Sequence, residues 1–176
     1  ISTVPSGMFR SCNYLSEISM PSTITIIGNG AFEDCENLSI VNLSESVTSI
    51  EGSAFDGCKS LKEITLPAQL NFIGQRSFGD CDSLEKIEIP SKVNKIEQYA
   101  FANCDLLKEI IIPHEAAIVG QYMLSGCPNL TEVHLQRAIL PGIDGMATHS
   151  ASGQPAPAGR KRSASDNRCT HLLWEY

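Results

Sequence analysis

The stretch AFDGCKSLKEITLP, residues 54–67, contains the pattern that decides the fold. A phenylalanine and a cysteine stand three residues apart, a leucine follows, and two apolar residues then alternate before a proline: Phe55, Cys58, Leu61, Ile64, Leu66 and Pro67. Alternation of apolar and polar residues indicates a strand with one buried face. Proline ends such a strand because it has no N–H for the ladder. The spacing of Phe55 and Cys58 predicts a short helical turn on the opposite side of the chain's path.

This stretch occurs six times at a constant interval of 23 residues, as three sets of equivalent positions show when the copies are aligned. The cysteines are Cys12, Cys35, Cys58, Cys81, Cys104 and Cys127, and the leucines are Leu15, Leu38, Leu61, Leu84, Leu107 and Leu130. The aromatic column is Phe9, Phe32, Phe55, Phe78 and Phe101, with Leu124 in sixth place. Residues 1–138 therefore divide into six units, 1–23, 24–46, 47–69, 70–92, 93–115 and 116–138. One unit cannot cover its own apolar face, so the units are expected to stack with one strand per coil about 4.8 Å apart.

The 23-residue unit resembles the BspA-like, or Treponema pallidum-type, leucine-rich repeat. The phrase A-F-x-x-C-x-x-L-x-x-I-x-L-P of that family stands at 54–67 and, nearly unchanged, at 77–90 and 100–113. The resemblance covers residues 1–138 and implies an α/β-type solenoid, a curved right-handed coil. It further implies a parallel concave β-sheet of short strands, with short helical turns or strands on the convex side.

Members of this family include bacterial surface adhesins that bind host matrix proteins and surface proteins of protozoan parasites. The resemblance therefore implies a non-catalytic binding scaffold without a cofactor. It favours the cell surface or the extracellular space, with the cytoplasm as the alternative location.

The six aligned cysteines are predicted to be buried structural residues. Equivalent residues of adjacent coils lie about 4.8 Å apart, whereas a disulfide needs Cβ atoms near 3.8 Å with their vectors turned together. The sequence contains no C-x2-C pair of the kind that binds soft metals. A catalytic thiol needs a partner base, and nothing explains why such a thiol should occur six times. A small apolar core residue, buried where the turn meets the strand, fits all six positions best.

The outward positions of the predicted concave sheet form the candidate binding surface, because they vary while the inward frame repeats. An exposed apolar side chain ringed by polar ones is a typical anchor for a partner, and Ile40 and Ile111 have that setting. Variation by drift on a solvated face is the alternative explanation. The candidate residues are Glu17, Ser19, Ile40, Asn42, Glu63, Thr65, Lys86, Glu88, Glu109, Ile111, Glu132 and His134.

Charge and composition limit the possible partners and divide the chain. The formal net charge of −7 argues against nucleic-acid or anionic-membrane binding. The sequence contains no run of eighteen apolar residues that would predict a membrane span.

Residues 139–176 are rich in Gly, Ala, Ser and Pro and are expected to form a flexible tail. The first coil shows no polar cap, so further repeats or a cap are expected before Ile1. Sequons stand at Asn37, Asn42 and Asn129.

The sequence thus predicts a recognition module that binds a protein or a glycan on its concave sheet. The alternative is a structural spacer or assembly scaffold within a longer repeat array. An enzyme ranks third, because no nucleophile–base set, phosphate loop or metal spacing is present.

Overall fold

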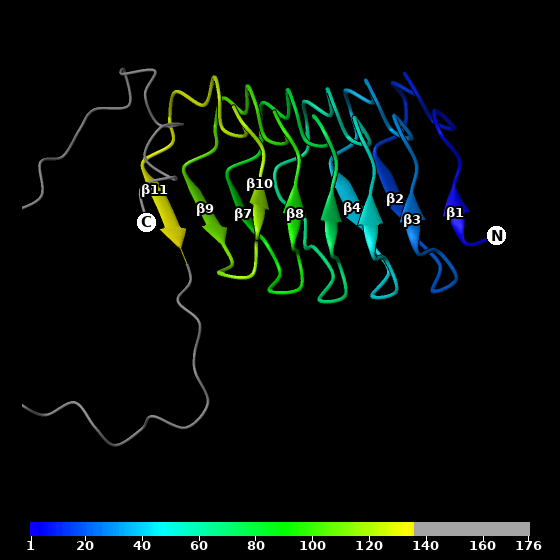
Figure 1. Ribbon diagram of the computed structural model, residues 1–176. Coiled ribbons are helices and arrows are strands. Elements are labelled where there is room, and N and C mark those ends of the chain that lie inside the picture. The colour runs from blue at the N-terminus through cyan, green and yellow to red at the C-terminus, as the bar shows by residue number, and fades with distance from the viewer. Residues whose placement is uncertain (136–176) are drawn as a thin grey trace, which may run out of the picture.

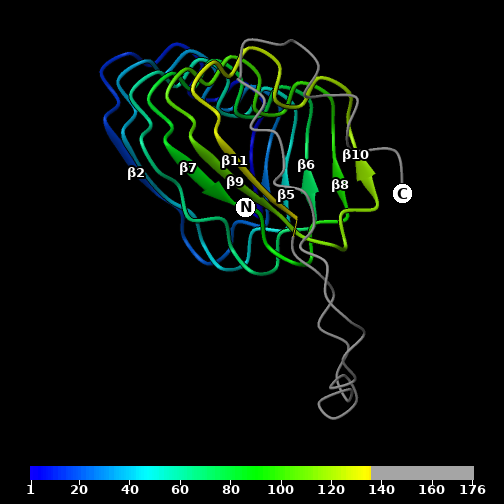
Figure 2. The ribbon, with the colours of Figure 1, turned by 90° about the vertical axis from the view of Figure 1, so that its left-hand side faces the viewer.

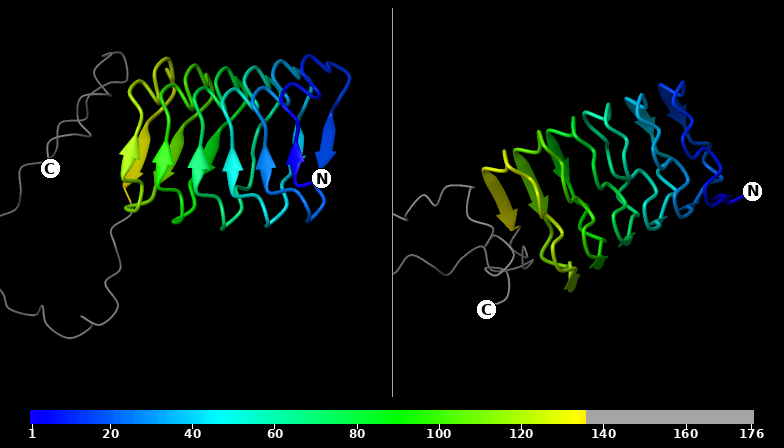
Figure 3. Two further views of the ribbon diagram at one scale, coloured as in Figure 1. Left: turned by 45° about the vertical axis from the view of Figure 1, so that its right-hand side comes forward. Right: turned by 90° about the horizontal axis from the view of Figure 1, so that it is seen from above.

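The chain folds into a parallel β-solenoid, seen in a computed structural model that describes residues 1–135 (Figure 1). The predicted tail at 139–176 lies outside the described residues. Each 23-residue unit makes one coil, numbered 1 to 6 from the N-terminus, and the coils stack side by side along one axis (Figure 3). Two sheets of short strands lie on opposite sides of the coil, and turns join them (Figure 2).

The first sheet passes through all six coils with one two-residue strand from each. Its strands pair in parallel in the order β1, β3, β5, β6, β8, β10. Partner residues are 23 apart, as in Thr3 with Ile26, so the constant repeat length sets the register directly. The strands are β1 Thr3–Val4, β3 Ile26–Ile27, β5 Ser49–Ile50, β6 Phe72–Ile73, β8 Lys95–Ile96 and β10 Ile118–Val119.

The second sheet carries the L-x-x-I-x-L segment of the repeat and is interrupted once. β2 pairs with β4, and β7, β9 and β11 pair with one another, but coil 3 has no strand between the two groups. Alternate side chains point inward, as Val41 of β4 and Ile87 of β7 do. The strands are β2 Glu17–Ser19, β4 Ile40–Asn42, β7 Lys86–Glu88, β9 Glu109–Ile112 and β11 Glu132–Leu135.

The segment from the first sheet to the cysteine is a hydrogen-bonded turn in each coil, and residues 1–135 contain no helix. The expected helical turn is therefore not confirmed. Alternate N–H groups donate to the carbonyl three residues back, as the Cys58 N–H does to Phe55 O at 3.2 Å. The N–H groups between them donate to the next coil, as the Phe55 N–H does to Ser77 O at 2.8 Å. Each turn holds two residues of positive φ, four apart, among them Arg76 and Asp80. Because of this alternation, the turns form a third ladder that joins the coils.

The core is a set of columns that run the length of the stack. Five phenylalanine rings lie parallel, with centroids 5.1, 5.2, 5.5 and 5.3 Å apart from Phe9 to Phe101. Such spacing is typical of offset-stacked aromatic pairs, each contributing about 0.5–1.5 kcal/mol beyond its burial. The cysteine and leucine columns of the inner coils are fully buried beside the rings. The inward positions that the repeat predicted are thus the core positions of the structure.

Replacing Phe55 by alanine tests the aromatic column. Phe55 is fully buried and stacks on rings at both sides, Phe32 and Phe78. We expect Phe55→Ala to lower the free energy of unfolding by about 3–5 kcal/mol, measured by urea denaturation followed by circular dichroism. Phe9→Ala is the matched control, because Phe9 is only half-buried and stacks on one ring; an equal loss for the two variants would contradict the column as a cooperative core.

A glycine at the end of β6 allows a close approach of two coils. A Cβ added at Gly74 would lie 2.5 Å from the backbone nitrogen of Gly52, whereas one added at Gly52 would first meet the Asn29 side chain at 3.0 Å. We expect Gly74→Ala to lower the free energy of unfolding by about 1–3 kcal/mol, because backbone has to move. Gly52→Ala is expected to cost less, since a side chain can turn away. Urea denaturation of both variants checks this, and a smaller loss for Gly74→Ala would be evidence against the close contact.

Candidate functional site

The predicted binding residues all belong to one face of the second sheet. Ten of them lie on β2, β4, β7, β9 and β11, while Glu63 and Thr65 lie in the strandless segment of coil 3. Except for Glu109 and Ile111, which are half-buried, their side chains are exposed. We call this surface, made by the twelve residues named above, the site face. The structure thus brings them to one side of the stack, in rows that follow the coils.

The rows of the site face follow from the parallel register. Glu17 lies beside Ile40 and Ser19 beside Asn42, across β2 and β4. On the other side of coil 3, one row holds Lys86, Glu109 and Glu132, and the next holds Glu88, Ile111 and His134. Positions 46 residues apart are therefore separated by one intervening coil. Sequence-distant side chains meet here only through stacking.

The two apolar residues of the site face differ in exposure. Ile40 has 48% of its surface exposed, although it stands on a strand. Ile111 is half-buried on β9, between Glu88 and His134. Ile40 belongs to the β2–β4 pair and Ile111 to the β7–β9–β11 group. The predicted anchors therefore sit on opposite sides of the interruption in the sheet.

A row of charges links β7, β9 and β11. Lys86 Nζ lies 3.0 Å from Glu109 Oε1, and His134 Nε2 lies 3.7 Å from the same oxygen. His134 Nε2 also lies 3.1 Å from Glu132 Oε2. Lys86 and Glu109 therefore neutralise each other across β7 and β9. In the described part of the chain Glu63 takes part in no ion pair, so its carboxylate remains open to a partner.

The sequon asparagines are all hydrogen-bonded. Asn37 Nδ2 donates to Asn13 O at 2.6 Å, and Asn129 Nδ2 donates to Asp105 O at 2.7 Å. Asn42 Nδ2 donates to Ser19 Oγ at 3.1 Å across the site face. Each amide thus also serves to join adjacent coils.

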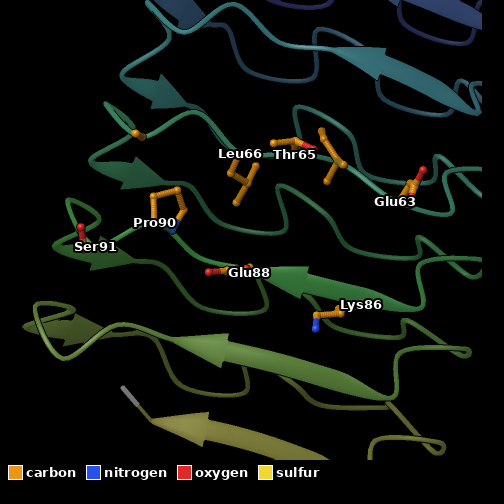
Figure 4. A pocket seen from close by; sticks show the side chains of 9 residues that line it. Glu63, Thr65, Leu66, Lys86, Glu88, Pro90 and Ser91 are labelled. Carbon is orange, nitrogen blue, oxygen red and sulfur yellow. The ribbon is translucent and has the colours of Figure 1, made fainter. Parts of the chain in front are cut away.

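A hollow of about 430 Å³ opens on the site face between coils 3 and 4 (Figure 4). Its polar members are Glu63, Thr65, Lys86, Glu88 and Ser91. Its apolar members are Ile64, Leu66, Ala68 and Pro90. The sequence predicted the four outward residues at 63, 65, 86 and 88, but not the residues beyond the strand ends. Ala68 and Ser91 lie after the prolines, where the repeat gives no signal of a surface feature.

Four of the six cysteines, Cys35, Cys58, Cys81 and Cys104, are buried in the core as predicted, and Cys127 is half-buried. The prediction is wrong for Cys12, which is exposed on the first coil because a neighbouring coil covers it on one side only.

The cysteine column also has a role that the sequence did not show. The thiols of coils 2 to 6 each donate to the phenylalanine carbonyl of the coil before them, from 2.9 Å for Cys35 to Phe9 O up to 3.3 Å for Cys58 to Phe32 O. The same bond occurs at Cys81, Cys104 and Cys127. All six cysteines of the array are free thiols. The column therefore joins the coils as well as filling space.

Burial makes the thiols of coils 3 and 4, Cys58 and Cys81, poor nucleophiles. It raises the pKa of Cys58 and of Cys81 far above the ordinary value of 9.0, mainly because an ionised sulfur would lose its solvation. Thiolates are the reactive and metal-binding form. Residues 1–135 also contain no group of three His, Cys, Asp or Glu side chains that is placed to hold a metal ion. Within the same residues, no helix has the length and apolar character needed to cross a membrane.

Comparison with known proteins identifies the repeat. The profile of the BspA type leucine-rich repeat region matches residues 2–131 in six copies. The chain belongs to the BspA-type leucine-rich repeat family. Comparison with curated proteins gives no match.

Three solved structures illustrate the likeness. The T. pallidum leucine-rich repeat protein TpLRR is 30% identical, with a TM-score of 0.72 over 76% of this chain and 63% of that one. A leucine-rich repeat protein from Bacteroides ovatus is 35% identical, with a TM-score of 0.71 over 76% of this chain and 34% of that one. A leucine-rich cell surface protein from Faecalibacterium prausnitzii is 25% identical, with a TM-score of 0.50 over 74% and 44%. The chain thus spans less than two thirds of the length of each of these proteins.

The thiol column predicts both low reactivity and a loss of stability in alkali. At pH 8, iodoacetamide should label the exposed Cys12 but leave Cys58 and Cys81 unmodified until urea is added, as read by peptide mass mapping. Above about pH 9 the unfolded chain ionises its thiols while the folded chain keeps them protonated. The free energy of unfolding should therefore be unaffected by these thiols below pH 9 and fall as the pH rises further.

The variant Cys58→Ala provides the control for that prediction. It removes one buried thiol, so its free energy of unfolding should fall less steeply between pH 9 and pH 10.5 than that of the parent chain. Labelling of Cys58 in the folded protein as fast as Cys12, or identical slopes for the two chains, would show that the thiols are accessible.

Proposed function

We propose that this chain is a non-catalytic recognition module that binds a protein or a glycan through its site face. Membership of a family of surface-type repeat proteins supports a binding or scaffold role. The neighbour from F. prausnitzii is itself described as a cell surface protein, which supports surface adhesion as the biological use.

One observation carries the proposal: the frame of the site face is constant while its outward side chains differ from coil to coil. Inward residues such as Val41, Ile87 and Ile110 are buried and similar in every inner coil. Outward residues range from acidic to basic to apolar, and Ile40 is 48% exposed beside Glu17 of the neighbouring strand. An exposed apolar residue surrounded by polar ones is the usual arrangement of an interface anchor.

The single face also suits a ligand with an extended surface. Parallel strands follow one another at about 4.8 Å, so six coils give a row about 24 Å long. The row is broad enough for several side-chain contacts, and open acidic groups at Glu17, Glu63 and Glu88 would favour a partner with basic groups.

The double variant Ile40→Asp/Ile111→Asp tests this proposal. Binding of the full chain to a panel of matrix proteins and glycans is measured by biolayer interferometry for parent and variant. A charge placed in an apolar contact is expected to weaken binding by at least about 2 kcal/mol, roughly thirtyfold. Circular dichroism establishes that the variant is folded.

Ile118→Asp is the matched control. Ile118 lies on β10 of the first sheet and is 53% exposed, close to the value for Ile40. We expect Ile118→Asp to bind like the parent. Equal loss in both variants, or no loss in either, would remove the site face as the binding surface.

A structural spacer or assembly scaffold is the second candidate function. Val133 and Leu135 of β11 are 44% and 60% exposed, whereas their partners Ile110 and Ile112 of β9 are buried. Such an apolar strand is suited to stacking against another coil. Absence of any ligand in the binding panel would favour this function.

A further inference from the structure

Within residues 1–135, the second sheet is interrupted at coil 3 and at no other coil. Glu63–Leu66 occupy the place of a strand, yet their backbone N–H and C=O groups make no backbone hydrogen bond within the described residues. In coil 2 the equivalent segment pairs with coil 1, and in coils 4 to 6 the strands pair with one another. In Figure 1 no strand arrow stands between β4 and β7 on this side of the stack.

The opening is confined to this side of the coil. The first sheet continues through coil 3, where β5 pairs with β6, and the turn ladder continues with Gly57 N–H to Gly79 O at 2.9 Å. The second sheet begins to pair with Glu85 N–H to Lys62 O at 3.1 Å, but no pairing follows from there into β7. Coil 3 is therefore held firmly on two sides and is unpaired on the third.

The unpaired segment keeps the orientation of a strand. Ile64 and Leu66 still point into the core, with 8% and 7% of their surface exposed, and Glu63 and Thr65 still point outward. Its backbone groups lack backbone partners, as those of an edge strand do, and another extended chain can pair with such groups. Groups of this kind are normally satisfied by a partner or by water.

The hollow beside this segment has the size and charge to accept such a chain. It extends over Glu63–Ala68 and Lys86–Ser91, with about 430 Å³ of space (Figure 4). Glu63 and Glu88 are exposed there and make no ion pair within the described residues, whereas Lys86 is paired with Glu109 outside the hollow. The hollow therefore presents two carboxylates without an ion pair, and its one cationic member, Lys86, is already paired with Glu109.

We propose that the opening at coil 3 binds an extended peptide segment of a partner protein, in which one Lys or Arg side chain lies between Glu63 and Glu88. The peptide pairs through its backbone with the free groups of Glu63–Leu66 and β7, in the manner of strand addition. A row of backbone donors and acceptors matches a polypeptide better than a glycan. A segment of about four residues spans the opening at about 3.3 Å per residue. This inference rests on the proposed function of the site face and names the chemistry of its partner.

Hydrogen exchange of the free chain is the first test. The amides of residues 63–66 are expected to exchange at least a hundredfold faster than those of β9, because only the latter are hydrogen-bonded. Equal protection of the two segments would show that the sheet is closed in solution and would overturn the proposal.

The second test uses a defined probe, an acetylated seven-residue peptide of alternating Val and Thr with a central Lys. Binding to the full chain should protect the amides of 63–66 and of β7. The same peptide with N-methylated alternate bonds should not bind, because its backbone donors are removed. Binding of the methylated peptide as strong as that of the parent peptide would contradict backbone pairing.

Charge reversal locates the basic side chain. Glu63→Lys/Glu88→Lys should weaken binding of the probe by about tenfold or more, since two attractions become repulsions. Glu115→Lys is the matched control, because Glu115 is exposed and lies outside the hollow; its affinity should be unchanged. A peptide with Glu in place of Lys should bind the double variant more tightly than the parent chain.

The outcomes separate this inference from the function on which it rests. Loss of a matrix-protein ligand in Ile40→Asp/Ile111→Asp, together with no binding of the probe, would leave the site face as a binding surface and overturn the peptide site. Protection of residues 63–66 by a glycan but not by the probe would also overturn it. Absence of both kinds of binding would overturn both proposals.

Discussion

The structure depends on hydrogen bonding from one coil to the next. A single 23-residue coil makes few hydrogen bonds of its own, since its strands have two to four residues and pair only with other coils, and every second amide of its turns donates to the next coil. Three ladders satisfy these groups along the stack: two sheets and the turn segments. Because unpaired buried amides are costly, a coil is stable only beside another. The stacked aromatic rings and the thiol–carbonyl hydrogen bonds add side-chain contacts between adjacent coils.

This dependence explains why the repeat length is constant and why the outward positions are free to vary. A change of length in one coil would shift its three ladders together, so every paired strand keeps the offset of 23 residues. A change at an outward position alters no ladder. Residues such as Lys86, Glu88 and Ile111 can therefore differ without cost to the fold, and a surface for recognition can be built on a uniform frame. The interruption at coil 3 is compatible with the fold because the other two ladders hold that coil.

The inward columns were predictable from the sequence because burial repeats with the period of the coil. Phe55, Cys58 and Leu61 are fully buried, as their recurrence indicated. The predicted helical turn was not confirmed, because the three-residue spacing of Phe55 and Cys58 is common to a helix and to this turn. Its distinguishing feature is a positive φ at residues such as Arg76 and Tyr99, where the residue type gives no signal. The thiol bonds were also invisible, since each joins residues 26 apart.

The sequence by itself determined the number of coils, their register and the residues that fill the core, because these follow from a period of 23 residues and from apolar burial. It also assigned the outward residues of the second sheet to one face. Only the tertiary structure decided which of these residues meet: Glu109 with Lys86 and His134 on one side of coil 3, and Asn42 with Ser19 on the other. The opening beside Glu63 was also decided only by the tertiary structure. Its segment has the same strand pattern as its neighbours, and pairing between coils depends on their packing along the whole stack.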